Sequence, residues 1–155
     1  MTMKYTEATA AGTVVSTELN SLADDAAALA SAAIENGDST NRYTHANFSI
    51  SLAAQGSARA ADAQVSLLIV PDVGGSVFGD VATLKTAQNG VARDSFGNAM
   101  TFSLDAATTA RVITLANVVL PNGNFKVGLL NESGQALGAS ANTIAMTGKF
   151  GFTNV

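Results

Sequence analysis

Apolar and polar residues alternate with a period of two over several short runs, and this alternation constrains the fold more than any other feature. The pattern is clearest over residues 48–52, 63–69, 100–104 and 125–129. In a β-strand successive side chains point to opposite faces, so alternation places every second side chain in a core. Leu68 and Val70 make both faces of their run apolar.

Turn-forming residues separate these runs. Pro, Gly and Asn either preset φ near −65° or tolerate a positive φ, and they cluster at 71–75, 89–90, 96–98, 121–124 and 131–134. The pattern predicts strands over 26–35, 46–53, 62–70, 80–86, 99–104, 109–118, 124–131 and 142–150. Eight or so short strands with regular turns are typical of an all-β antiparallel sandwich or barrel. The segment 121–124 predicts a hairpin between its flanking strands.

Residues 16–34 admit two interpretations. Leucines and alanines recur there at a spacing of three to four, alanine favours helix, and Ser16 or Ser21 would serve as an N-cap. Residues 29–34 also suit a strand that enters the sandwich before the turn at 36–40. We predict a strand over 26–35, preceded by a helical turn or an extended arm.

Length and composition indicate one domain with an unusually neutral surface. The chain has 155 residues, which fits a single domain. It is 47% hydrophobic and only 13% charged, against roughly 25% charged in ordinary domains. We predict an N-terminal arm over residues 1–18, extended or partly helical, and a single β-sandwich domain over residues 19–155.

Composition also excludes several classes of function. The chain has no cysteine, which rules out disulfides, Cys-ligated metals and a thiol nucleophile. A net charge of −4 argues against a nucleic-acid partner, which usually needs a clustered basic surface. The apolar runs are far shorter than the roughly 20 residues that cross a bilayer, and no secretory signal opens the chain. We therefore expect a soluble protein made in the cytoplasm, with no membrane partner and no cofactor.

The candidate catalytic and ligand-binding residues have plain structural interpretations. His45, the one histidine, has no sequence neighbour to orient it as a general base, so we expect a loop or strand-edge residue. Asp24 and Asp25 are adjacent and point apart, so they form no carboxylate pair for acid–base chemistry. Residues 94–98 lack the repeated oxygen ligands of a calcium loop. Residues 74–79 have the glycines of a phosphate loop but no following lysine, and we predict a hairpin turn. Sequence alone therefore predicts no catalytic or metal site, and no enzyme.

Sugar binding is also disfavoured by composition. Many β-sandwiches bind carbohydrate on exposed Trp or Tyr rings, but this chain has no Trp and only Tyr5 and Tyr43. Its seven phenylalanines mostly occupy inward strand positions, where core packing explains them.

Several segments resemble a group of small virion proteins of tailed bacteriophages. The resemblance rests on Asn20–Asn36, followed by Asp38–Arg42, with an Ala-Ile-acid-Asn run and a Ser-Thr-Asn turn. It continues through turns and strand edges at Val65–Pro71, Leu120–Val127, Leu130–Leu137 and Ala141–Thr143. It covers most of residues 16–147. Many proteins of this group have a Trp or Tyr in the second strand or the loops after it, where this chain has mainly Phe and Ala.

The resemblance implies a jelly-roll sandwich and a role on the phage head. It indicates a non-enzymatic cement or decoration protein that binds the major capsid protein, and hence a virion location on the capsid surface. Low charge and small side chains suit close packing against neighbours. We expect residues 1–15 to order on binding, with Tyr5, Val14 and Val15 as interface anchors. We also expect the protein to bind itself as a dimer or trimer. A tail or neck component and a receptor- or carbohydrate-binding module are the alternatives.

Overall fold

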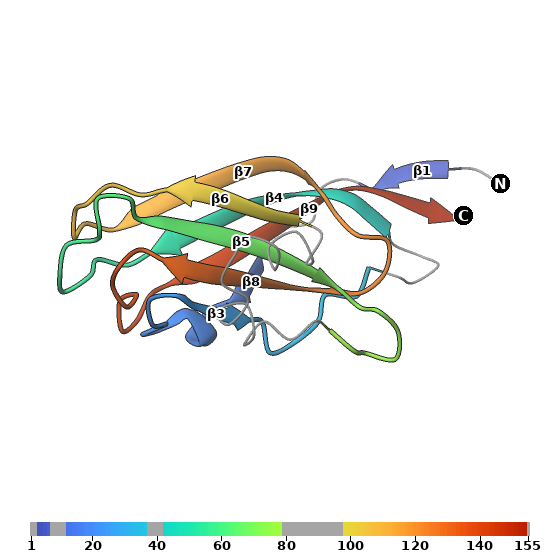
Figure 1. Cartoon of the computed structure of the whole chain (residues 1–155). Coiled ribbons are helices and arrows are strands. Elements are labelled where there is room, and N and C mark those ends of the chain that lie inside the picture. The colour runs from blue at the N-terminus through green and yellow to red at the C-terminus, as the bar shows by residue number, and fades with distance from the viewer. Residues whose placement is uncertain (1–2, 7–11, 37–41, 79–97, 155) are drawn as a thin grey trace.

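A computed structural model describes residues 3–6, 12–36, 42–78 and 98–154, which form nine strands and one short 3₁₀ helix (Figure 1). The elements are β1 (Met3–Thr6), β2 (Gly12–Val15), the 3₁₀ helix η1 (Thr17–Leu19), β3 (Ala26–Leu29), β4 (Arg42–Leu52), β5 (Gln64–Pro71), β6 (Asn98–Ser103), β7 (Arg111–Val119), β8 (Phe125–Glu132) and β9 (Thr143–Asn154). The predicted all-β class is confirmed.

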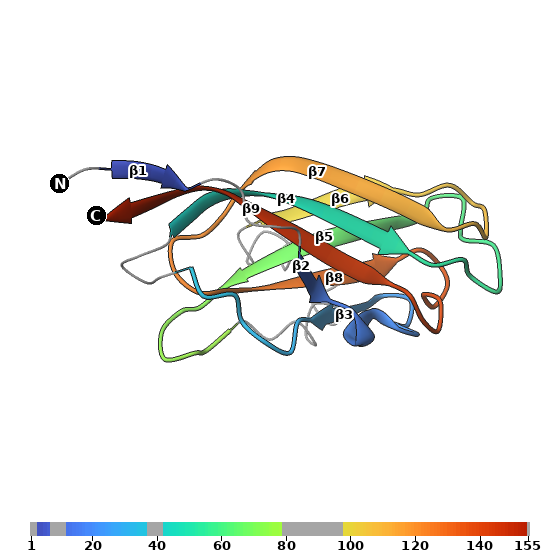
Figure 2. The same cartoon turned by 180° about the vertical axis from the view of Figure 1, so that it is seen from behind.

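The strands form two antiparallel sheets packed face to face (Figures 1 and 2). The first sheet has the order β1-β9-β4-β7, and β2 also pairs with β9; the second has the order β3-β8-β5-β6. Strands β2 to β9 therefore supply four strands to each sheet, in the orders β2-β9-β4-β7 and β3-β8-β5-β6. This is the arrangement of an eight-stranded jelly roll. The strand order confirms the predicted jelly-roll sandwich.

The hydrophobic core lies between the two sheets and uses one alternating set of side chains from each long strand. The largest side chains of this core, all under 2% exposed, include Val15 of β2, Leu19 of η1, and Ile50, Val65, Leu67, Ile69, Phe125, Leu129 and Ile144 of the longer strands. The opposite face of β5 and β8 is apolar as well, since Leu68, Val70 and Leu130 form a second buried cluster with Ala27, Leu29 and Phe78 packed against it. The prediction that both faces of this run are apolar is confirmed.

The predicted strand positions agree with the structure at β4 to β9, with ends displaced by a few residues. β4 begins earlier and β9 ends later than predicted. The strand predicted over 80–86 lies outside the described residues. Over 16–34, a strand rather than a long helix is present, but β3 ends at Leu29 and does not reach residue 35. The helical part is η1 alone among the described residues.

Close packing on β8 explains why the alanines of β3 form a strand despite their helix propensity. β3 pairs antiparallel with β8, and Leu29 lies opposite Gly128. A Cβ at Gly128 would overlap the carbonyl oxygen of Ala28 and lie 2.5 Å from the Cδ2 of Leu29. The two strands fit because the residues that meet are small, and this tertiary fit outweighs the local preference.

The hairpin predicted at Pro121–Asn124 is wrong. β7 belongs to the first sheet and β8 to the second, so this segment crosses between the sheets. The amide of Leu120 donates to the carbonyl of Thr44 at 2.9 Å, on the first sheet. The carbonyl of Asn124 accepts from the amide of Asp72 at 2.8 Å, on the second. Turn residues fix local backbone angles but do not determine which strand the next segment joins.

The segment predicted as a hairpin turn at 74–79 is described up to Phe78, and this part folds back on itself. Asp72 and Phe78 form an isolated bridge. The Asp72 carboxylate accepts the amides of Gly74 at 2.8 Å and Ser76 at 3.2 Å. Gly74 adopts φ +119°, which favours glycine. The glycines therefore make a turn that the aspartate braces.

The described N-terminal residues lie along the edge of the first sheet. β1 pairs with the end of β9, with Tyr5 opposite Phe152. β2 pairs with the beginning of β9, with Val15 opposite Ile144. β2 is therefore a strand of the sandwich, although it falls within the segment predicted as an arm.

Candidate functional site

The residues considered for catalysis lie apart from one another. His45 is half-buried in β4, opposite Val119, and its Nδ1 is 3.0 Å from the hydroxyl of Thr44. The Asp24 carboxylate accepts the amide of Gly134 at 2.8 Å, which braces the turn after β8. Within the described ranges, no three His, Asp or Glu side chains gather where they would hold a metal ion. Of the segment 94–98, which was compared with a calcium-binding loop, residues 94–97 lie outside the described residues.

Tyr43 has a packing role. It is half-buried against the main core, and a Cβ at Gly148 would lie 3.0 Å from its Cε1. The ring therefore rests on the backbone of β9. A sugar-stacking platform needs an exposed ring face, and the large hydrophobic side chains that are exposed in the described part of the chain are all valines: Val73, Val77, Val112 and Val119.

The three predicted interface anchors occupy different environments. Val15 is 1% exposed in the main core, and Val14 is half-buried against that core. Tyr5 is held by the backbone pairing of β1 with β9. Val15 therefore stabilises the sandwich of the single chain by its burial in the core. The role of the N-terminal segment in binding a partner stays a prediction.

The middle of the outward side of the first sheet is an uncharged surface. Because Ser49 lies opposite both Thr114 and Ala145, and Asn47 lies opposite Thr147, these side chains share one face across β7, β4 and β9. We call it the outer face. It is made up of Thr13, Asn47, Ser49, Ser51, Val112, Thr114, Ala116, Thr143, Ala145 and Thr147, which are half-buried or exposed. His45 and Val119, which lie opposite each other, border it on the same side of the sheet.

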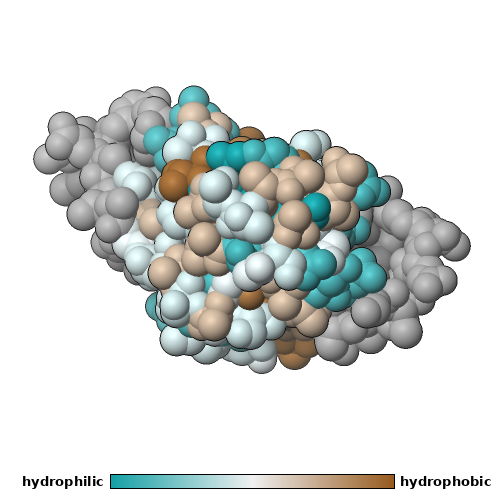
Figure 3. All heavy atoms as spheres, turned by 90° about the vertical axis from the view of Figure 1, so that its left-hand side faces the viewer, coloured by the Kyte–Doolittle hydropathy of each residue, from teal (hydrophilic) through white to brown (hydrophobic). Residues whose placement is uncertain are grey.

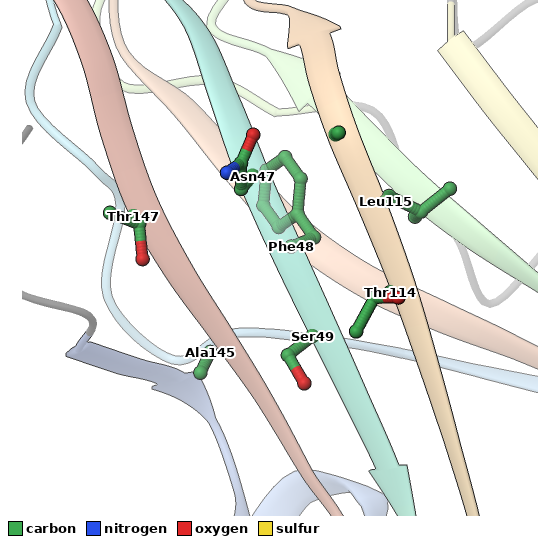
Figure 4. Close-up of a pocket in the computed structure, with 8 residues that line it drawn as sticks. Asn47, Phe48, Ser49, Thr114, Leu115, Ala145 and Thr147 are labelled. Atoms are coloured by element: carbon green, nitrogen blue, oxygen red, sulfur yellow. The ribbon is translucent and has the colours of Figure 1, made fainter.

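A shallow depression of about 240 Å³ lies in the middle of the outer face (Figure 4). Its lining side chains include Asn47, Ser49, Thr114, Ala145 and Thr147, which come from three adjacent strands (Figure 4). The pairing of β4 with β7 is irregular at this point, between residues 46 and 48 of β4. There Asn117 adopts φ +57°, and its amide donates to the side-chain oxygen of Asn47 at 3.0 Å.

The outer face suits contact with another macromolecule better than chemistry. Its hydroxyl, amide and methyl groups carry no charge, so covering them buries no ion. Ser, Thr and Ala are also short, so a partner backbone can approach closely. The members named above include no residue that commonly serves as a general acid, a general base or a charged metal ligand, and His45 lies at their border on the same side of the sheet.

Buried polar side chains hold the loops at one end of the sandwich, the left-hand end in Figure 1. Arg59, 3% exposed, donates to the carbonyls of Ala107 at 2.8 Å and Thr109 at 2.9 Å. It lies 3.4 Å from the carboxylate of Asp105, which Arg111 also contacts. Burial lowers the pKa of Arg59, and the nearby positive charge of Arg111 lowers it further. Arg59 therefore ties the loop between β4 and β5 to the loop between β6 and β7.

Buried asparagines also hold loops in place through hydrogen bonds to the backbone. Asn131 donates to the carbonyls of Leu22, Ala23 and Gln135 at 2.8–3.1 Å. Asn142 donates to the carbonyl of Gly138 at 2.6 Å and accepts the amide of Ala53 at 3.0 Å. Among the residues described, the surface of this end is a mixture of near-neutral, mildly hydrophobic and hydrophilic residues (Figure 3).

Asn36 has the corresponding role at the opposite end. Its side chain donates to the carbonyls of Tyr43 and Pro121, both at 2.9 Å, and accepts the amide of Tyr43 at 2.7 Å. Sequence reasoning missed Arg59 and all three asparagines, since a single polar residue in a loop looks the same whether it is buried or solvated.

Glu18, in η1, ties that helix to the residues that follow β3. Its carboxylate accepts the amides of Ser31 at 2.9 Å and Ser16 at 3.2 Å. Hydrogen bonds from backbone amides, its own first and that of Ser31 next, lower the pKa of Glu18 to about 2.

No helix in the described residues is long and apolar enough to cross a membrane.

Comparisons with known proteins assign this chain to no family. The chain matches no protein-family model, and no curated protein sequence is significantly similar to it. A solved structure from Desmodium yellow mottle tymovirus is similar to 99% of this chain and 89% of its own chain, with 10% identity and a TM-score of 0.40. The assignment of the jelly roll therefore rests on the strand order itself.

Proposed function

We propose that this chain is a non-enzymatic structural protein of a tailed-bacteriophage virion, a capsid cement or decoration protein that binds the major capsid protein and stabilises the head. The outer face carries the proposal, because it is a broad, uncharged surface on a sandwich whose loops are held by buried polar side chains. The resemblance of residues 16–147 to small tailed-phage virion proteins supports the same role.

The proposal assigns the contact with the capsid to the outer face. The outer face covers four strands about 4.8 Å apart and about five residues along each of β4, β7 and β9, which gives an area of roughly 19 Å by 17 Å. This is less than half of the ~800 Å² that each partner buries in a standard interface. One copy therefore binds modestly through this face alone, and repetition over a shell supplies the remaining stability through multivalency.

Cosedimentation with expanded capsids that lack the protein tests this function. We expect the wild-type protein to bind at a fixed copy number and to raise the temperature at which the capsids open. Ser49→Glu places a charge in the centre of the outer face, so we expect it to abolish binding while the variant stays folded. Ser57→Glu is the matched control, since Ser57 is exposed in a loop away from that face, and it should bind like the wild type.

Two outcomes would count against the proposal in different ways. A wild-type protein that stays in the supernatant would remove the cement function. Equal binding of Ser49→Glu and Ser57→Glu would keep that function but remove the outer face as the contact. The packing of Tyr43 on Gly148 disfavours the carbohydrate-binding alternative. If the protein is instead a tail or neck component, it should bind isolated phage tails or necks and not capsids.

A further inference from the structure

Three asparagines of this sequence are followed directly by glycine: Asn36, Asn89 and Asn122. In such a pair the backbone nitrogen of the glycine can attack the amide carbon of the asparagine side chain, because glycine has no Cβ to hinder the approach. The ring closes only where the side chain can turn and the glycine nitrogen is accessible. The fold therefore decides which of these pairs reacts.

Asn36 is protected from this reaction. Its side chain belongs to a residue that is 1% exposed. The Nδ2 group donates to the carbonyls of Tyr43 and Pro121, and the Oδ1 atom accepts the amide of Tyr43. These three hydrogen bonds must open before the side chain can turn toward its own backbone. Asn89 lies outside the described residues.

Asn122 differs from Asn36 in each of these respects. It is exposed, in the segment that crosses between the sheets. Within the part of the chain that the structure describes, neither the Asn122 side chain nor the Gly123 amide makes a hydrogen bond. Gly123 has φ +118°, and a Cβ built on it would have no atom within 4 Å. The pair therefore has room for the ring to form and for water to reach it.

We infer that Asn122 is a modification site, at which the folded chain deamidates to aspartate and isoaspartate. The Gly123 nitrogen loses its proton and bonds to Cγ of Asn122, and the bond from Cγ to the side-chain nitrogen breaks, which releases ammonia. Solvent water then adds to one of the two carbonyls of the resulting five-membered ring, and that carbonyl's bond to the Gly123 nitrogen breaks. Opening at Cγ gives aspartate, and opening at the main-chain carbonyl gives isoaspartate, whose main chain runs through Cγ. This inference does not depend on the proposed function.

The products change this end of the sandwich in two ways. Each adds a carboxylate, and so one negative charge, to a chain whose net charge is −4. Isoaspartate also adds one atom to the main chain between two points that Asn36 holds. The Pro121 carbonyl accepts the Asn36 side chain at 2.9 Å, and the Asn124 side-chain oxygen accepts the Asn36 amide at 3.2 Å. We therefore expect isoaspartate at residue 122 to weaken the brace that Asn36 provides.

Peptide mapping of the folded protein after incubation in mildly alkaline buffer tests the site. Cleavage after Lys and Arg places Asn36, Asn89 and Asn122 in three different peptides. Fragmentation in the mass spectrometer distinguishes Asn122 from Asn117 and Asn124. We expect Asn36 to deamidate at least about tenfold more slowly than Asn122, because its hydrogen bonds must open first. In urea-unfolded protein the two rates should be similar. Equal rates at Asn36 and Asn122 in the folded protein would overturn the inference.

The variant Asn122→Gln tests the consequence, because a glutamine keeps the exposed amide but forms the larger ring far more slowly. After the same incubation, we expect the wild type to unfold at lower urea concentration than Asn122→Gln. Fresh Asn122→Asp introduces the charge without the added main-chain atom, and it should unfold like the fresh wild type. Equal unfolding of incubated wild type and incubated Asn122→Gln would overturn the expected effect on the Asn36 brace. An incubated wild type that has no isoaspartate at residue 122 would overturn the modification itself.

Discussion

Replacing Arg59 with Met should strongly destabilise the fold, because Arg59 is a buried cation that holds two loops together. The substitution leaves the carbonyls of Ala107 and Thr109 without their charged donors, at contacts now 2.8 and 2.9 Å long. A hydrogen bond to a charged group contributes about 1.5–3 kcal/mol. Burial of the guanidinium lowers its pKa and is itself unfavourable, so part of this contribution is offset. We therefore expect a net loss of about 3 kcal/mol in the free energy of unfolding.

Urea unfolding followed by circular dichroism measures this loss, provided that the m-value stays constant between variants. Arg111→Met is the matched control. Arg111 also contacts Asp105, but its side chain is 39% exposed, and exposed ion pairs contribute about 1 kcal/mol or less. If Arg59→Met lost no more stability than Arg111→Met, the interpretation of Arg59 as a buried structural brace would be refuted.

Three further variants test the packing and the electrostatics. Asn36→Ala removes the side chain that binds Tyr43 and the carbonyl of Pro121, and should cost about 3 kcal/mol in urea unfolding; a loss below 1 kcal/mol would contradict its bracing role. Gly128→Ala forces β3 away from β8 and should lower the unfolding free energy by about 1–3 kcal/mol, whereas Gly12→Ala, with open space around it, should change it little. Glu18→Gln tests pH dependence: its folded pKa of about 2 lies below the ordinary 4.5, so its carboxylate stabilises the fold above pH 4.5 and loses this effect as pH falls toward 2. Acid titrations of stability should therefore be flatter for Glu18→Gln than for the wild type in that window, and identical slopes would contradict the assignment.

The sequence predicted those parts of the fold that depend on local pattern. Alternation located β4 through β9 because each of these strands has one face in the core, and the double apolar pattern of residues 65–70 correctly indicated burial on both faces. The path of the chain after 121–124 could not be predicted from local pattern. Whether β8 pairs with β7 or crosses to β5 in the other sheet depends on contacts between residues distant in sequence. The short extent of β3 depends in the same way on its fit against Gly128.

The candidate surfaces were less accessible to sequence reasoning. Ser49, Thr114 and Ala145 are distant in sequence and inconspicuous in type, and only the register of three strands places them on one face. Low charge indicated a surface suited to contact with neighbours, but not which surface. Likewise, nothing local distinguishes Arg59 from a solvated arginine, because its burial depends on two loops that meet in the folded chain.

A cryo-electron microscopy map of expanded capsids incubated with the protein tests the central claim most directly. The account predicts added density at a fixed position on every capsomer, shaped as a jelly roll with the outer face against the shell. Density bound through the loop end would contradict the assignment of the outer face. Capsids with no added density at saturating protein would contradict the cement function itself.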